Sequence, residues 1–226
     1  LRVLAVQVDL HLMVLSDLGV AAAVDTDHAF AFIGDDVSFR RQTGVFRFGL
    51  DLDQVAARVD LLDQFEILAQ SWPGPLTIVL PKQSSVPKLV TAGLDSVAVR
   101  IPSHPIAQAL LQECNLPIAA PSANRSNYIS PSTAQHVCEC LSGRVQYVID
   151  GGACECGIES TVVSLGEDGT VRLLRPGAVA LETLEEALNS TVLVDARSKG
   201  DEEPAISPGQ LKTHYSPRTP LFFLED

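Results

Sequence analysis

Leu116-Pro-Ile-Ala-Ala-Pro-Ser-Ala-Asn124 is a short apolar run that ends in proline, serine and asparagine. The apolar part, Leu116 to Ala120, predicts a buried strand, and the proline that follows marks its end. Ser122 and Asn124 then place a hydroxyl and a carboxamide at the rim of a sheet, where ligands of open α/β folds usually bind. The stretch therefore predicts a sheet-based fold with a binding site at one of its strand ends.

Three other predicted strands also carry polar residues at one end. Ser96-Val-Ala-Val-Arg100 ends on a guanidinium, Ser160 precedes the apolar run Val162 to Leu165, and Arg175 closes the strand after that. A guanidinium at the end of an apolar strand needs a partner, either an internal carboxylate or an anionic group of a ligand. Four polar strand ends in one domain indicate a shared cleft.

Strands and helices alternate irregularly along the chain, and the sequence contains one hairpin turn, Gly166-Glu-Asp-Gly169. Asp51 or Asp53 is the predicted N-cap of the first helix, Ser130 that of the third, and Thr183, in a capping box, that of the last. We expect helices over Val55 to Trp72, His104 to Cys114, Ser130 to Leu141 and Thr183 to Leu188, and strands over Leu1 to Asp9, Ile78 to Leu80, Val97 to Ile101, Val145 to Ile149, Thr161 to Leu165 and Thr170 to Leu174. The predicted fold class is α/β of the α+β type, a mixed twisted sheet flanked by helices with a concave central cleft.

Composition narrows the classes of partner. The 226 residues include 16 Lys and Arg against 28 Asp and Glu, which gives a net charge of −12. This charge repels a phosphate backbone, so no direct tight binding to nucleic acid is expected. Residues 10–24 are apolar but are interrupted by His11 and Asp17, and they are too few to span a bilayer, so no membrane association is expected either.

The five cysteines do not predict a metal site. They lie at positions 114, 138, 140, 154 and 156, and the two Cys-x-Cys pairs are spaced more closely than the ligand pairs of most zinc sites. We expect reduced thiols and no resident metal. A Walker-type glycine-rich lysine motif is also lacking, so any nucleotide must be held by scattered side chains.

Seven motifs, in order along the chain, resemble the YrdC-like family of threonylcarbamoyl-AMP synthases in its long, two-domain form. They are Trp72-Pro-Gly-Pro-Leu-Thr77, Val97-Ala-Val-Arg-Ile-Pro102, Pro121-Ser-Ala-Asn124, Ser130-Pro131, Gly157-Ile-Glu-Ser-Thr-Val-Val163, Leu174-Arg-Pro-Gly177 and Ser207-Pro-Gly-Gln-Leu-Lys-Thr-His-Tyr-Ser-Pro217. The resemblance implies a YrdC-like synthase domain over residues 53–194, a linker over 195–218 that closes over the site, and the first strand of a truncated second domain over 219–226. Residues 1–52 do not match, and we expect a divergent N-terminal region that packs on the main domain or misfolds.

The resemblance also implies roles for individual residues. It assigns threonine contacts to Arg100, Ala120 and Ser160, and nucleotide contacts to a larger set that comprises Ser96, Ser122, Asn124, Ser130, Arg175, His214 and Tyr215. The helix predicted to begin at Pro131 would add free backbone N–H groups that suit an anion. No side chain is expected to act as a catalytic nucleophile, and magnesium is expected to arrive with ATP.

The implied reaction is a condensation of L-threonine, bicarbonate and ATP. Threonine and bicarbonate give N-carboxythreonine, whose carboxylate attacks the α-phosphate of ATP and expels pyrophosphate, as in a nucleotidyltransferase. Such a reaction depends on positioning and on electrostatic stabilisation of phosphate charge. The product, threonylcarbamoyl-AMP, would supply a separate transferase that makes threonylcarbamoyladenosine in tRNA. The expected compartment is the cytoplasm, or an organelle if a transit peptide has been removed.

The chain departs from the family pattern before its first shared motif. The family usually has a Thr-x-Thr-x-Tyr-Gly-Leu segment for threonine and a Lys-x-Arg pair for the triphosphate, and residues 1–70 contain neither. This departure predicts little activity for the chain as given. Two alternatives stay open: a non-catalytic nucleotide- or RNA-binding YrdC-like module, and a carbamoyl-adenylate-forming enzyme of the hydrogenase-maturation type, whose Cys-x-x-Cys modules are lacking here.

Overall fold

The computed structural model describes three N-terminal strands and most of the chain from Val59 to Asp195. It covers residues 4–8, 11–15, 30–32 and 59–195, the last range without 83, 85, 89–90, 92, 115–117, 121, 126–127, 146 and 167. Several predictions therefore lie outside the described residues. They concern the N-caps Asp51 and Asp53, the linker after Asp195, His214, Tyr215 and the strand over 219–226.

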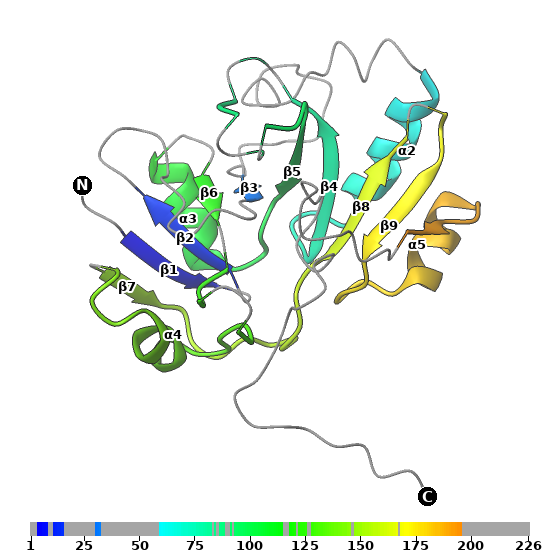
Figure 1. The fold of residues 1–226 in the computed structure, drawn as a ribbon. Coiled ribbons are helices and arrows are strands. Elements are labelled where there is room, and N and C mark those ends of the chain that lie inside the picture. The colour runs from blue at the N-terminus through cyan, green and yellow to red at the C-terminus, as the bar shows by residue number, and fades with distance from the viewer. Residues whose placement is uncertain are drawn as a thin grey trace, which may run out of the picture.

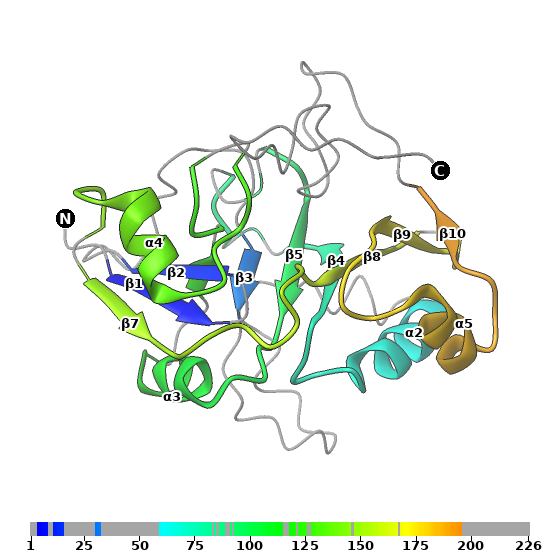
Figure 2. The ribbon, with the colours of Figure 1, turned by 90° about the horizontal axis from the view of Figure 1, so that it is seen from below.

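A mixed sheet of seven strands forms the centre of the fold, in the order β10-β9-β8-β4-β5-β3-β6 (Figure 1, and Figure 2 for β10). The strands are β3 (Phe30–Phe32), β4 (Leu76–Pro81), β5 (Ser96–Arg100), β6 (Ile118–Ala120), β8 (Thr161–Leu165), β9 (Val171–Arg175) and β10 (Leu193–Val194). The pairs β3–β5, β4–β8 and β9–β10 are parallel, and the other neighbours are antiparallel. The predicted mixed sheet is confirmed, and so is the hairpin that joins β8 to β9.

A second sheet of three strands adjoins the first at β6. Its central strand, β1 (Leu4–Val8), pairs antiparallel with β2 (His11–Leu15) and parallel with β7 (Tyr147–Asp150). β2 also contacts β6, the edge strand of the larger sheet. The predicted strand over Leu1 to Asp9 is thus confirmed for its central residues, and the strand predicted from Val145 begins two residues later.

Helices flank both sheets. The described residues contain four helices, α2 (Val59–Ala69), α3 (Pro105–Cys114), α4 (Ala134–Leu141) and α5 (Leu181–Leu188). α2 and α5 contact each other and lie side by side against the half of the large sheet that contains β4, β8 and β9 (Figures 1 and 2). α4 contacts β7, and α3 contacts β1. The prediction of a sheet flanked by helices is therefore confirmed.

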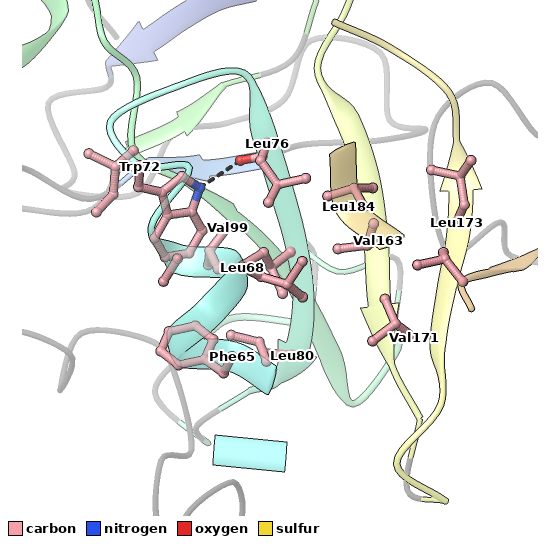
Figure 3. Packing of buried hydrophobic residues seen from close by; sticks show 14 of the residues in the cluster. Phe65, Leu68, Trp72, Leu76, Leu80, Val99, Val163, Val171, Leu173 and Leu184 are labelled. Carbon is pink, nitrogen blue, oxygen red and sulfur yellow. Dashed lines mark hydrogen bonds between the residues drawn. The ribbon is translucent and has the colours of Figure 1, made fainter. Parts of the chain in front are cut away.

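The main hydrophobic core lies between the sheet and the pair α2 and α5 (Figure 3). Trp72 is anchored there because its indole Nε1–H donates to the carbonyl oxygen of Leu76 at 2.6 Å, and a buried indole needs such a partner. Its ring meets Phe65 edge-on, with the ring centroids 6.0 Å apart. Truncating a buried leucine such as Leu68 to alanine typically costs about 2–5 kcal/mol. The side of the sheet that faces α2 therefore carries the main hydrophobic core, which stabilises the fold.

The third predicted helix begins later than expected. The prediction placed its N-cap at Ser130, but α4 begins at Ala134 and is capped by Thr133, whose side chain accepts from the His136 N–H at 3.3 Å. Ser130 instead donates its hydroxyl proton to Glu159, at 2.6 Å. This long-range contact holds Ser130 in a loop, and the Thr133 hydroxyl becomes the cap instead.

The last helix begins earlier than expected. The capping box predicted a start at Thr183, but α5 begins at Leu181, and its N-cap residue Ala180 makes no side-chain cap. Two hydrogen bonds from β8 explain the earlier start. The Thr161 hydroxyl donates to the Val179 carbonyl at 2.7 Å and accepts from the Val179 N–H at 2.9 Å. These two bonds fix the chain just before the helix, so the helix starts before the box is reached.

Candidate functional site

The predicted site residues on β5 point away from α2 and α5. Side chains alternate between the two faces of a strand, and Val97 and Val99 belong to the main core, so Ser96 and Arg100 project to the opposite face. A small buried cluster lies on that face too, made of Val79, Val162 and Leu174 with Ala98 packed against it. We call this side of the seven-stranded sheet, opposite α2 and α5, the site face.

Arg100 is buried at the end of β5, with 2% of its surface exposed. Its Nε–H donates to the carbonyl oxygen of Gly74 at 2.8 Å, and the Gly74 N–H donates to the Ile101 carbonyl at 2.8 Å. A Cβ at position 74 would lie 2.2 Å from the Ser71 carbonyl oxygen, so only glycine fits there. The predicted partner for the guanidinium is therefore in part a backbone carbonyl, which fixes the plane of the side chain.

Arg175 on β9, Ser160 just before β8 and Thr77 on β4 form one hydrogen-bonded group. The Arg175 Nε–H and Nη2–H donate to the Ser160 carbonyl at 3.1 and 2.8 Å, and Nη2 also lies 3.1 Å from the Ser160 hydroxyl oxygen. That oxygen lies 2.8 Å from the Thr77 Oγ1. The sequence predictions included Arg175 and Ser160 but missed Thr77, although it ends the Trp72–Thr77 motif and is a polar residue on an apolar strand.

Glu159 ties the Ser130 loop to the start of β8. It accepts the Ser130 hydroxyl proton, and its backbone carbonyl accepts from the Ala178 N–H at 3.1 Å. A Cβ at Gly177 would lie 2.4 Å from that same carbonyl oxygen, so the two segments touch with no room for a side chain. The sequence predictions missed Glu159 as well. Its position next to Ser160 in a shared motif was the available signal.

The residues after β6 lie at the other end of the sheet. β6 runs antiparallel to β3, β3 runs parallel to β5, and Ala120 is level with the middle of β5 through Phe30. The chain that follows, with Ser122 and Asn124, therefore leaves the sheet toward the end where Ser96 begins β5. The structure thus brings Arg100 and Ser160 to one end of the site face and places Ser96 at the other, about 13 Å away along β5.

Asn124 is held in its loop by its own amide group. Its Nδ2 donates to the backbone carbonyls of Arg125 and Tyr128 at 2.9 and 2.8 Å, while its Oδ1 is buried and has no hydrogen-bond partner in the described part of the chain. The preceding Ala123 packs on α4 against Val137 and Leu141. A buried acceptor of this kind calls for a ligand or an ordered water.

Residues 4–8, 11–15, 30–32 and 59–195, with the gaps named above, hold no group of three or more His, Cys, Asp or Glu able to bind a metal ion. Cys138, Cys140, Cys154 and Cys156 are not joined by a disulfide within these residues. No helix in this part of the chain is both long and apolar enough to cross a membrane.

By fold and geometry, the chain is a mixed α/β domain with its core on one face of the sheet and buried polar residues on the other. Residues 49–177 match the family model Sua5_yciO_yrdC, described as telomere recombination, and residues 179–226 match the model of the threonylcarbamoyl-AMP synthase C-terminal domain. Because the first match covers more than half of the 226 residues, the chain belongs to the Sua5/YciO/YrdC family.

Curated relatives carry the name threonylcarbamoyl-AMP synthase. The protein from Bacillus subtilis is 46% identical over 160 residues, which are 70% of this chain and 46% of the relative. The protein from Pyrococcus abyssi is 43% identical over 167 residues, which are 74% of this chain and 49% of the relative. The chain therefore spans about half the length of these relatives.

A solved structure confirms the predicted fold. The crystal structure of P. abyssi Sua5 complexed with L-threonine superimposes with a TM-score of 0.74 and 31% sequence identity. The match covers 96% of this chain and 62% of the P. abyssi chain. The predicted family resemblance is confirmed as well.

Proposed function

We propose that this chain carries the threonine- and nucleotide-binding domain of a threonylcarbamoyl-AMP synthase. The proposed reaction condenses L-threonine, bicarbonate and ATP to threonylcarbamoyl-AMP, pyrophosphate and water, the water being released when threonine and bicarbonate form N-carboxythreonine. The observation that carries the proposal is the buried polar group on the site face, Arg100 with Thr77, Ser160 and Arg175, in a chain of this family. The P. abyssi structure that supports it was solved with L-threonine bound.

The end of the site face with Arg100 suits the amino acid. A guanidinium offers five N–H donors in a rigid fork that matches a carboxylate, and the Gly74 carbonyl fixes the plane of this fork through Nε. The Ser160 hydroxyl supplies a second polar contact nearby on the same face. Ala120, level with the middle of β5, is proposed to add a small apolar surface beside this end.

The nucleotide is proposed to extend from this end toward Ser96. The distance of about 13 Å between the two ends of β5 suits an extended adenylate better than a small amino acid alone. Asn124 offers its buried acceptor oxygen to a donor of the nucleotide, and Ser122 offers a hydroxyl. Ser130 contacts Glu159 and Arg175 contacts Ser160, so both are proposed to meet the phosphates at the Arg100 end, next to the amino acid. His214 and Tyr215 are proposed to close over the nucleotide from the linker.

The chemistry proposed for this arrangement needs no covalent intermediate with the protein. The carboxylate of N-carboxythreonine attacks the α-phosphate of ATP, and pyrophosphate leaves. The site face would hold the two reactants in line. The reaction would then be accelerated mainly by this orientation and by cations near the phosphates. Magnesium enters with ATP as part of the substrate and neutralises triphosphate charge. The product would pass to a separate tRNA threonylcarbamoyl transferase in the cytoplasm.

An omission experiment tests the proposal. The full chain is incubated with L-threonine, bicarbonate and Mg-ATP, and pyrophosphate and the adenylate product are measured with each substrate left out in turn. A parallel sample uses a chimera in which residues 1–52 are replaced by the matching segment of the B. subtilis relative. We expect product only when all three substrates are present. Pyrophosphate release that does not need threonine, in both proteins, would contradict the proposal.

The absence of the family's Lys-x-Arg pair from residues 1–70 favours a second candidate, a non-catalytic nucleotide-binding module. Its signature would be ATP binding without product in either protein. Binding to RNA is the weaker form of this candidate because the net charge is −12. Calorimetry with Mg-ATP, run beside the omission experiment, separates the two candidates.

A further inference from the structure

Thr77 and Ser160 share a hydrogen bond in a closed part of the site face. Thr77 is 0% exposed and Ser160 is 2% exposed. Their hydroxyl oxygens lie 2.8 Å apart, and the Nη2 of Arg175 lies 3.1 Å from the Ser160 oxygen. Three polar side chains from three adjacent strands therefore meet at one serine hydroxyl.

This group of three side chains has one hydroxyl proton more than it has acceptors. Arginine has no acceptor, so the Ser160 oxygen accepts from Arg175. The two hydroxyls own two protons, and the bond between them uses one, whichever of them donates it. The other proton has no acceptor among the contacts described for the pair. A buried donor without an acceptor is costly, so a native site of this kind is expected to meet a partner.

The direction of the spare proton follows from the same contacts. If Thr77 donates to Ser160, both lone pairs of the Ser160 oxygen are occupied, one by Thr77 and one by Arg175. The Ser160 proton must then point away from both. The positive charge of Arg175 favours this orientation, because the negative end of the hydroxyl dipole faces the guanidinium.

We propose that Thr77 is a positioning residue that fixes Ser160 as a hydrogen-bond donor toward an anionic oxygen of the amino-acid substrate. This inference rests on the proposed function and assigns a role to a residue that does not itself touch the substrate. Thr77 sets the orientation, and Ser160 makes the contact. Loss of Thr77 should therefore weaken the binding of threonine without affecting the nucleotide.

The test compares two identical substitutions at two buried threonines. Thr77→Val keeps the branched shape and removes the hydroxyl, and Thr77→Ser keeps the hydroxyl. The matched control is Thr161→Val, because Thr161 is also 0% exposed but its hydroxyl, within the described part of the chain, bonds only to the backbone of Val179. Dissociation constants for L-threonine and for Mg-ATP are measured by calorimetry on the full chain and on the chimera, together with melting temperatures.

We expect Thr77→Val to raise the dissociation constant for L-threonine by roughly fivefold, the scale of one neutral hydrogen bond, and to leave that for Mg-ATP unchanged. Thr77→Ser should stay within about twofold of the wild type. Thr161→Val should lower the melting temperature and leave both constants unchanged. In a Ser160→Ala background, Thr77→Val should have no further effect, because Thr77 acts through Ser160.

Each contrary result has a distinct meaning. Unchanged threonine affinity in Thr77→Val overturns the positioning role and leaves the proposed function standing. A parallel loss of both affinities and of melting temperature overturns it in favour of a purely structural bond. If neither the wild-type chain nor the chimera binds L-threonine, both this inference and the proposed function fail. Thr77→Ala provides the same comparison if Thr77→Val does not fold.

Discussion

At the scale of single residues, Arg100 joins the stability of the fold to the proposed chemistry. Its Nε–H donates to the Gly74 carbonyl, so the guanidinium stabilises the turn after Trp72. The same guanidinium lies on the site face. Arg100→Lys keeps the charge but loses the planar fork. We expect a small fall in melting temperature, from the lost bond of about 1 kcal/mol, and a much larger rise in the KM for threonine than in that for ATP.

The control for Arg100→Lys is Arg172→Lys on β9, which β8 and β4 separate from β5 in the same sheet. Arg172 is partly exposed and pairs with Asp168 at 3.3 Å, away from the residues that bond to Ser160. It should leave both Michaelis constants unchanged. Equal rises in the two constants for Arg100→Lys, with a large fall in melting temperature, would assign Arg100 to structure alone.

At the scale of elements, the turn of the β8–β9 hairpin contains one hydrogen-bonded carboxylate, that of Asp168. Asp168 accepts from the Thr170 hydroxyl at 2.6 Å and from the Thr170 N–H at 3.1 Å, and these bonds, the hydroxyl first, hold the pKa of Asp168 below its ordinary 3.8. A carboxylate with a lowered pKa stabilises the folded state above its unfolded-state pKa, and this contribution is lost as the pH falls through the folded-state pKa.

The lowered pKa of Asp168 predicts how the effect of Asp168→Asn on the melting temperature changes with pH. At neutral pH the variant should melt below the wild type, because asparagine cannot supply the charged acceptor. The difference should persist down to about pH 3.8 and close below it, as the wild-type carboxyl takes up its proton. Thermal melts across this range measure it, with Glu155→Gln, at an exposed loop position, as the control. A gap that stays constant at low pH would show that the charge is not what matters.

The same elements show where sequence reasoning holds and where it does not. The hairpin was predictable, because its turn needs a left-handed residue and the sequence supplies Gly169, with φ of 76°. The starts of α4 and α5 were not, because the bonds that set them join residues far apart: Ser130 with Glu159, and Thr161 with Val179. Local capping signals lose to such contacts when a tertiary partner takes the hydroxyl or fixes the chain first.

At the scale of the whole molecule, the motifs predicted the fold class and the family, but not the layout of the site. Polar strand ends predicted one cleft, and the register adds that Ser96 lies at one end of the site face and Arg100 and Ser160 at the other. Strand order carries this information, and a single sequence does not contain it. Thr77 escaped prediction for the same reason, because its partner Ser160 is 83 residues away.

Residues 1–52 should limit the rate of the proposed reaction in this chain. The family model begins to match at residue 49, and the Lys-x-Arg pair and the Thr-x-Thr-x-Tyr-Gly-Leu segment are absent before that point. A single donor that stabilises developing charge is typically worth about 10²–10³ in rate. We therefore expect the chimera to release threonine-dependent pyrophosphate at least roughly 100-fold faster than the chain as given, while the affinity for Mg-ATP changes less.

Single-turnover assays on the two proteins, with calorimetry on each, measure this difference. Arg100→Lys in the chimera is the internal control, because it should reduce the gained activity through threonine and not through ATP. Equal rates for the two proteins would mean that residues 1–52 supply the missing cations in a different arrangement. The search for the triphosphate contacts would then turn to that segment, in particular to Arg40 and Arg41, the adjacent cations within it.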